Sequence, residues 1–207
     1  MQPAVTTLSL PTVLTTPIRP AKSPCAATTL VIFTAVDGVL RDAETRSTRE
    51  TRAALRMLAQ RDIPLVLTSA RSPAELLALQ RELGVRYPFV AEGGASLHIP
   101  AGYFPELTRI GAHVDGWNIV EFKVPEAGHG IRLLMSLYRL CSEEVVIVGL
   151  ADTASDRVLL HEADVPVIVR NGGADQEALL REMPSAYLTT AAGPAGWSEV
   201  ILGSVGE

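Results

Sequence analysis

The sequence predicts an α/β fold in which helices flank a parallel, doubly wound, Rossmann-like sheet. Short and almost entirely apolar runs recur along the chain, as is typical of strands that are buried on both faces. Segments with apolar residues at helical spacing separate these runs, and strands that alternate with helices form parallel sheets. The 207 residues, of which 47% are hydrophobic and 20% charged, are enough for one sizeable domain.

The expected elements follow one another from residue 29. Strands are expected at 29–34 (TLVIFT), 63–68 (IPLVLT), 88–91, 144–148 (EVVIV) and 165–169 (VPVIV). Helices are expected at 48–60, 72–84, 130–140, 156–161 and 175–182. Residues 72–75 (SPAE) form a capping box with proline at the first helical position, which marks a helix start. A last helix is expected to follow residues 193–197 (GPAGW), with Trp197 packed in the core.

Residues 1–28 differ from the rest of the chain. They hold five of the 14 prolines and six threonines, and the first acidic residue of the sequence is Asp37. No charged segment leads into an apolar one, so a secretory signal is not expected. We interpret this stretch as an extended arm, which could lie along a sheet edge.

Charge and cysteine content exclude several classes of partner. Lys plus Arg is 18 and Asp plus Glu is 23, so the net charge is −5 and nucleic acid is not an expected partner. No apolar run approaches the roughly 18 residues that span a bilayer. Cys25 and Cys141 cannot form a disulfide framework, so a reducing, cytoplasmic location is expected. Arginines between residues 41 and 56 are interleaved with acids, which favours a solvated helix face.

Polar residues follow the predicted strands where a ligand would bind. In a doubly wound sheet the ligand lies beyond the carboxyl ends of the strands, near the switch in strand order. The residues at these ends are Asp37, Ser69, Glu92-Gly93-Gly94, Asp152 and Asp156.

Three of these segments resemble the motifs of haloacid dehalogenase (HAD) superfamily phosphatases. They are residues 33–40 (FTAVDGVL), the pair Thr68-Ser69, and residues 149–156 (GLADTASD). Further segments are similar to the mannosyl-3-phosphoglycerate phosphatase branch of that superfamily. They are 69–75 (SARSPAE), 91–95 (AEGGA), 99–104 (IPAGYF), 158–169 (VLLHEADVPVIV) and 193–197.

The resemblance implies a role for each site residue. Position 35 would hold the aspartate that attacks phosphorus, and Asp37 would protonate the leaving oxygen and then activate water. Ser69 would hold the phosphoryl oxygens, with Ala70, Gly93 and Gly94 beside it. Mg²⁺ would be bound by Asp37, through its backbone carbonyl, and by Asp152 and Asp156. The lysine of the family falls at His129, and Lys123 is the only lysine nearby.

The sequence departs from the family in its nucleophile and in its cap. Ala35 stands at the nucleophile position, and a methyl group can neither attack phosphorus nor bind a metal. The family inserts a cap domain between the third strand and the lysine helix, whereas only residues 95–128 are available here. We therefore expect an arm at 1–28, a HAD-like core at 29–94 and 129–207, and a minimal cap at 95–128. The cap would be a hairpin or a small subdomain that includes residues 96–99 and 117–124.

Three functional hypotheses follow. The chain is an impaired Mg²⁺-dependent phosphohydrolase, or a non-catalytic protein that binds Mg²⁺ or a phosphorylated ligand or acts in assembly, or an active phosphatase with an engineered Asp-to-Ala change. Several departures occur together, which favours a naturally degenerate site. The expected ligand is a phosphorylated small molecule or a sugar phosphate, and a homo-oligomer is possible.

Overall fold

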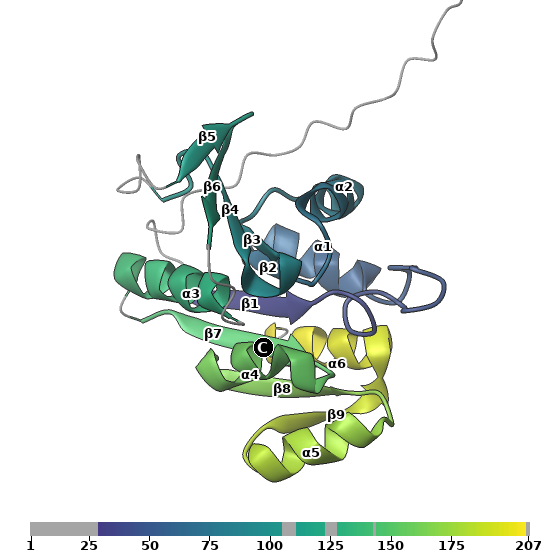
Figure 1. Cartoon of the computed structure of the whole chain (residues 1–207). Helices are drawn as coiled ribbons and strands as arrows, with labels where there is room; N and C mark the ends of the chain where they lie inside the picture. Colours follow the sequence, from purple (N-terminus) through teal and green to yellow (C-terminus); the bar gives the residue numbers. More distant parts are fainter. Residues whose placement is uncertain (1–28, 105–110, 123–127, 143, 206–207) are drawn as a thin grey trace, which may run out of the picture.

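The central feature of the molecule is a sheet of mainly parallel strands. The computed structural model describes residues 29–104, 111–122, 128–142 and 144–205, so the predicted arm and Lys123 lie outside the described residues. Within these ranges the strands form one nine-stranded sheet in the order β5-β6-β4-β3-β2-β1-β7-β8-β9 (Figure 1). The six strands from β3 to β9 in this order are parallel. The predicted α/β, Rossmann-like class is confirmed.

The elements have the following bounds. The strands are β1 (Leu30–Ala35), β2 (Leu65–Thr68), β3 (Phe89–Ala91), β4 (Ser96–Pro100), β5 (Ala112–Val114), β6 (Trp117–Glu121), β7 (Val146–Ala151), β8 (Val165–Arg170) and β9 (Tyr187–Ala192). The helices are α1 (Arg52–Gln60), α2 (Pro73–Leu83), α3 (His129–Cys141), α4 (Arg157–Glu162), α5 (Ala174–Glu182) and α6 (Gly193–Val205), with short 3₁₀ turns η2 (Glu92–Gly94) and η3 (Ala154–Asp156).

The order of the strands reverses at β1, which places the switch point between β1 and β7. From β1 the chain proceeds outward through β2 and β3, and it then returns to the other side of β1 as β7. Residues 31–35 of β1 and 147–151 of β7 are all buried, as expected of central strands covered on both faces. Because a ligand binds beyond the carboxyl ends of strands at such a point, the fold directs attention to the ends of β1 and β7.

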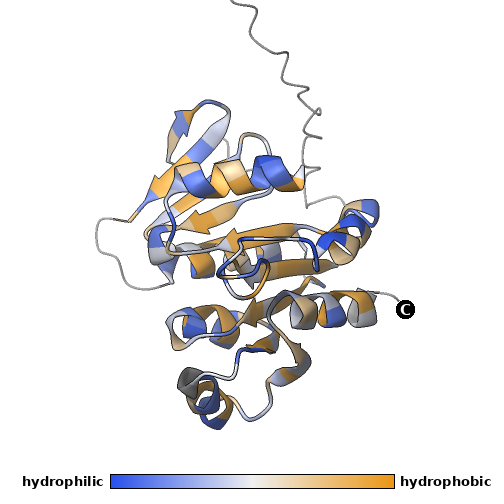
Figure 2. Cartoon of the chain, turned by 90° about the vertical axis from the view of Figure 1, so that its right-hand side faces the viewer, coloured by the Kyte–Doolittle hydropathy of each residue, from blue (hydrophilic) through white to orange (hydrophobic). Residues whose placement is uncertain are grey.

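Helices cover both faces of the sheet. Helices α1 and α6 contact each other, and α3 contacts α4. Trp197 of α6 is fully buried, as expected, and its indole Nε1–H donates to Thr34 Oγ1 at 3.1 Å, which joins α6 to β1. In Figure 2 the strands are mostly coloured as hydrophobic, whereas the helices also carry hydrophilic segments on their outer sides.

The segment predicted as a minimal cap lies in the main sheet. Strand β4 pairs antiparallel with β3, β6 with β4, and β5 with β6, so these three strands extend the sheet beyond β3. A two-residue turn, Asp115-Gly116, joins β5 to β6, and both residues have positive φ angles of 49° and 79°. This Asp-Gly turn matches the right-handed twist of the strands that it joins. The extension leaves the carboxyl ends of β1 and β7 without a separate covering layer from the described part of residues 95–128.

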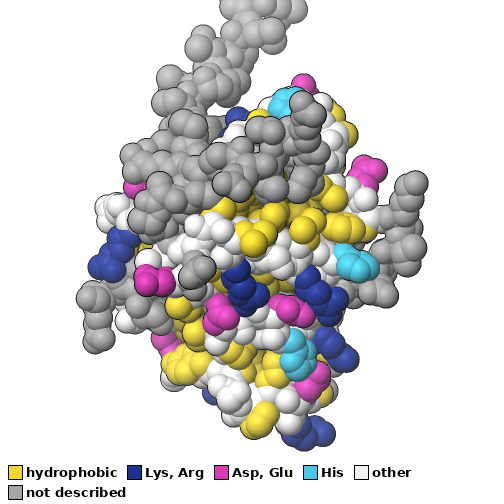
Figure 3. Space-filling view, turned by 90° about the vertical axis from the view of Figure 1, so that its left-hand side faces the viewer, with side chains coloured by type: hydrophobic (Ala, Val, Ile, Leu, Met, Phe, Trp, Pro, Cys, Tyr) yellow, Lys and Arg dark blue, Asp and Glu magenta, His cyan; other side chains and the backbone are white. Residues whose placement is uncertain are grey.

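Two further findings concern the surface and the cysteines. No helix among the described residues is both long enough and apolar enough to cross a bilayer. On the face shown in Figure 3, acidic and basic side chains lie close together. Cys141 is the last residue of α3 and is partly buried against the core.

Candidate functional site

A cavity of about 230 Å³ opens where β1, β2, β3 and β7 end. Eight of the candidate site residues predicted from the sequence line this cavity, although they are spread over more than 120 positions of the chain. The lining comprises Ala35, Val36, Asp37, Thr68, Ser69, Ala70, Val90, Gly93, Gly94, Gly128, Ile131, Asp152, Thr153, Ser155, Asp156 and Val158. The parallel sheet accounts for this gathering, since the strands concerned all end at the same edge.

Ala35 is the last residue of β1 and lies in the wall of this cavity. It is 4% exposed, and it pairs with Thr68 at the end of β2. Its methyl group therefore stands at the inner end of the site, between the loops that carry Asp37 and Ser69. A methyl group offers neither a lone pair for attack nor a ligand for a cation.

Asp37 is held by two arginines. Arg71 Nε–H donates to Asp37 Oδ2 at 2.6 Å and its Nη2–H donates to Oδ1 at 3.2 Å, while Arg41 Nε–H donates to Oδ1 at 2.9 Å. Burial alone would raise the pKa of Asp37, but the hydrogen bonds and charges of Arg71 and Arg41 outweigh it and lower the pKa below its ordinary value of 3.8. Both carboxylate oxygens are engaged, and the group stays ionised at neutral pH.

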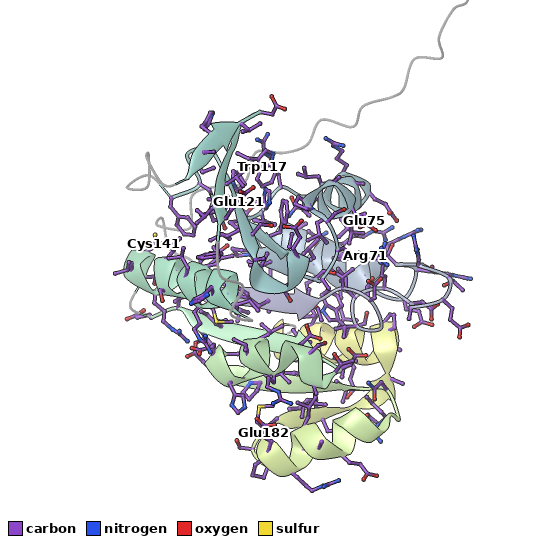
Figure 4. All side chains as sticks on the ribbon, viewed as in Figure 1. Arg71, Glu75, Trp117, Glu121, Cys141 and Glu182 are labelled. Carbon is purple, nitrogen blue, oxygen red and sulfur yellow. The ribbon has the colours of Figure 1, made fainter. Side chains whose placement is uncertain are left out.

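The two arginines are functional-site residues that sequence reasoning missed. Arg41 precedes α1, is 8% exposed and turns toward Asp37, so its assignment to a solvated helix face is wrong. Arg71 lies just before α2 and also forms an ion pair with Glu75 at 2.5 Å (Figure 4). Two signals were present for Arg71. It lies two residues after Ser69, at the end of a strand, and it belongs to the segment 69–75 that resembles the mannosyl-3-phosphoglycerate phosphatase branch.

We expect Arg71→Gln to raise the pKa of Asp37 and to lower the free energy of unfolding at pH 7 by no more than about 1 kcal/mol, because the carboxylate is one-third exposed and solvent screens the pair. A depressed carboxylate pKa stabilises the fold above the unfolded-state pKa, and this contribution is lost as the pH falls through the folded-state pKa. The difference between the variant and the unchanged chain should therefore be smaller at pH 3 than at pH 7. Urea unfolding at both pH values measures this difference in the free energy of unfolding. An equal difference at the two pH values would show that loss of the ion pair is not its cause.

The acidic loop after β7 places two carboxyl groups in the cavity. Asp152 is 7% exposed, and Asn171 Nδ2–H donates to its backbone oxygen at 2.7 Å and to Oδ2 at 3.4 Å. Burial, opposed by the Asn171 bond and reinforced by the charges of Asp156 and Asp37, raises the pKa of Asp152 to about 6. Burial also raises the pKa of Asp156, although Thr153 donates to its Oδ2 at 2.9 Å.

The donor set for a divalent cation is incomplete. Mg²⁺ prefers several oxygen ligands in near-octahedral geometry, with one or two carboxylates among them. Asp152 and Asp156 supply two carboxylates, and the backbone carbonyl of Asp37 is a third expected ligand. Ala35 supplies none, although the resemblance implies a carboxylate at that position. Among the described residues there is no group of three or more His, Cys, Asp or Glu side chains that could hold a metal. The residues present therefore do not fit the complete metal site that the resemblance implies.

The loops after β2 and β3 form the opposite wall. The Arg71 backbone N–H donates to Ser69 Oγ at 3.2 Å, and the Gly93 N–H donates to the Ser69 carbonyl at 3.1 Å. Gly94, with a φ of 102°, approaches the start of α3 so closely that a Cβ would lie 2.8 Å from the Gly128 nitrogen. The Ser69 loop is thereby fixed against η2, and η2 against α3.

The start of α3 faces the cavity, but its histidine does not line it. Gly128 and Ile131 belong to the lining, and the first turn of α3 contains no acidic residue. The His129 ring lies against the Phe122 ring, with centroids 5.5 Å apart and an interplanar angle of 20°. The positive end of this 13-residue helix therefore faces the cavity. The side chain at position 129 is not part of the cavity lining.

The fold and this set of loops resemble those of HAD-like phosphatases, and comparison with known proteins agrees. The haloacid dehalogenase-like hydrolase family matches residues 32–104. The strand order, the motif order and this match agree with HAD superfamily phosphatases, and the resemblance to their mannosyl-3-phosphoglycerate phosphatase branch is confirmed.

Two curated relatives belong to that branch by name. The chain is 22% identical to the glucosyl-3-phosphoglycerate/mannosyl-3-phosphoglycerate phosphatase of Methanococcoides burtonii, over 86% of the chain and 97% of the relative. It is 36% identical to the protein of the same name from Persephonella marina, over 36% of the chain and 28% of that relative.

Solved structures of low sequence identity share the fold. A HAD superfamily phosphatase from Bacteroides thetaiotaomicron is 14% identical, with a TM-score of 0.58 over 92% of the chain and 99% of its own. A Thermoplasma acidophilum protein is 13% identical, with a TM-score of 0.58 over 87% and 99% of the two chains.

Proposed function

We propose that this member of the HAD-like phosphatase family binds a phosphate monoester in the cavity and does not form an aspartyl-phosphate. The observation that carries the proposal is the pair formed by Ala35 and Asp37. The position from which the family attacks phosphorus holds a methyl group, and the neighbouring carboxylate is held ionised by Arg41 and Arg71. An ionised carboxylate cannot protonate a leaving oxygen.

Several features of the cavity support binding of a phosphate group. The start of α3 presents the positive end of a helix dipole, to which anions bind readily. The Ser69 hydroxyl lies in the lining and can donate to a phosphoryl oxygen. Asp152, with a pKa near 6, is partly protonated under mildly acidic conditions and can then donate as well. The named activity of the curated relatives, on sugar 3-phosphoglycerates, makes a sugar phosphate the first ligand to test.

We expect Mg²⁺ to bind only weakly in this cavity, with Asp152 and Asp156 as its carboxylate ligands. When bound, Mg²⁺ would supply positive charge near the phosphoryl oxygens. With two carboxylates instead of three, we expect little stabilisation of the fold at millimolar Mg²⁺, which thermal melting measures.

The test is a calorimetric titration with inorganic phosphate and phenyl phosphate, combined with an assay for phosphate release. We expect saturable binding without release. Ser69→Ala should weaken binding about fivefold, which is the loss of roughly 1 kcal/mol for one hydrogen bond. Ser136→Ala is the matched control, because this exposed hydroxyl on α3 donates to the Arg132 carbonyl outside the cavity lining. Phosphate release by the unchanged chain, or no binding, would contradict the proposal.

A further inference from the structure

A second cavity, of about 170 Å³, lies between the end of α2 and the Asp115-Gly116 turn. It is lined by Leu77, Gln80, Arg81, Val85, Arg86, Asp115 and Trp117, none of which lines the first cavity. At this volume it is smaller than the roughly 300–1,000 Å³ of pockets for drug-sized ligands, so an occupant would be a small molecule.

Arg86 and Trp117 build one wall of this cavity. The Arg86 guanidinium lies over the Trp117 ring, with its carbon 5.0 Å from the ring centroid, and its Nη2–H donates to the Gly116 carbonyl at 2.8 Å. Trp117 is 9% exposed and packs edge-on against Phe89, with centroids 5.3 Å apart. These contacts hold the cation in place, so the wall is formed before any ligand arrives.

Gln80 contributes a buried acceptor that no group of the described residues satisfies. The side chain is 2% exposed, and its Nε2–H donates to the Tyr87 carbonyl at 2.8 Å, which fixes the direction of the amide. Its Oε1 has no hydrogen-bond partner in the part of the chain that the structure describes. A buried acceptor left without a donor costs about 1–3 kcal/mol. This oxygen is itself shielded from solvent, so a ligand N–H group would reach it only if the Gln80 side chain turned toward the cavity.

The remaining polar groups carry charges of both signs. Arg81, in the last turn of α2, and Arg86 are cationic, whereas Asp115 is anionic, and among the described residues no ion pair joins Asp115 to either arginine. Leu77, Val85 and the Trp117 ring supply apolar surface between them. A ligand that satisfies all of these groups needs a carboxylate, an ammonium group and a small apolar part.

We propose that this cavity binds a small α-amino acid. Arg81 and Arg86 receive the carboxylate, and Asp115 receives the ammonium group. The side chain of the amino acid lies against Leu77, Val85 and Trp117. The site is separate from the phosphate cavity, and its occupation requires no property of Ala35 or Asp37.

The test titrates the full-length chain with glycine, L-serine and L-leucine by calorimetry, with thermal melting in parallel. We expect saturable binding of at least one of them and a rise in the melting temperature. Arg81→Gln should weaken that binding at least about tenfold, as the loss of a charged hydrogen bond does. Arg81 is exposed, so this variant is expected to fold, whereas Arg86 also supports the hairpin.

Two controls distinguish binding in this cavity from non-specific attraction to the protein surface. Arg61→Gln removes an exposed arginine that lines neither cavity, and binding should not change. Acetate and methylammonium, as the two halves of the ligand, should each bind more weakly than the amino acid. The proposal is overturned if no amino acid binds, if Arg81→Gln binds as tightly as the unchanged chain, or if acetate binds as tightly as the amino acid. Phosphate titration of Arg81→Gln reports on the first cavity separately.

Discussion

Asp152→Asn is expected to raise the free energy of unfolding at pH 7 by up to about 3 kcal/mol. The pKa of Asp152 is about 6 in the folded protein, against an ordinary value of 3.8. Since each pH unit of difference corresponds to about 1.4 kcal/mol, ionising this carboxyl group at neutral pH opposes folding by roughly that amount. Asparagine has nearly the same shape and carries no charge.

The stabilisation by Asp152→Asn is expected to depend on pH. A carboxyl group with a raised pKa holds its proton in the folded state after the unfolded state has lost it. Its contribution to stability therefore falls as the pH rises from about 4 to about 6, and it stays low above pH 6. The advantage of Asp152→Asn should grow across this window and be small at pH 4.

Urea unfolding between pH 4 and pH 8, in the presence of a chelator, measures the effect. Asp42→Asn is the matched control, because hydrogen bonds from Thr45 lower the pKa of that exposed carboxylate, so removing its charge should not stabilise the fold. If Asp152→Asn is no more stable than the unchanged chain at pH 7, the carboxylate is not strained by burial. A stabilising substitution in a cavity wall is typical of a functional site, where a group is kept at the expense of stability.

The strands and helices were predictable where local pattern decides them. The apolar runs at β1, β2 and β7, and the capping box at Ser72, identify buried strands and a helix start without any tertiary information. Strand β9 (YLTTAA) was missed, because it lies at the sheet edge with only Thr189 fully buried and lacks an apolar run. Residues 96–99 and 117–124 were expected in a hairpin or a small subdomain. In the structure β4 pairs with β6, but it also pairs with β3, and this extension of the main sheet could not be predicted from local sequence.

The candidate site was predictable in position but not in its electrostatics. Strand ends and motif order predict that Asp37, Ser69 and Asp152 share a cavity, and they do. The arginine pair on Asp37 depends on side chains that come from 4 and 34 residues away, in loops without periodic pattern. The position of the His129 ring depends on Phe122, to which no sequence motif connects it.

Ala35→Asp is expected to produce phosphate release at least about a hundredfold above that of the unchanged chain, if the missing carboxylate is what blocks turnover. Loss of a nucleophile in other hydrolases costs far more than this. The substitution places a carboxylate at the end of β1, beside Asp152 and Ser69, and completes a set of three acidic groups with Asp152 and Asp156. Mg²⁺ affinity should therefore rise, and Mg²⁺ should raise the melting temperature of this variant more than that of the unchanged chain.

The same substitution should destabilise the protein in the absence of Mg²⁺, because position 35 is buried and its new neighbours are acidic. Ala70→Asp is the matched control, since it adds one carboxylate to the lining of the same cavity at a position that does not end β1. Release by Ala35→Asp alone ties turnover to the end of β1. If both variants fold and neither releases phosphate, the loss of catalysis also involves Asp37. Its carboxylate stays ionised while it is paired with Arg71 and cannot act as an acid. Ala35→Asp combined with Arg71→Gln then tests that second step, and activity confined to the combination would identify the arginine pair as a separate obstacle to catalysis.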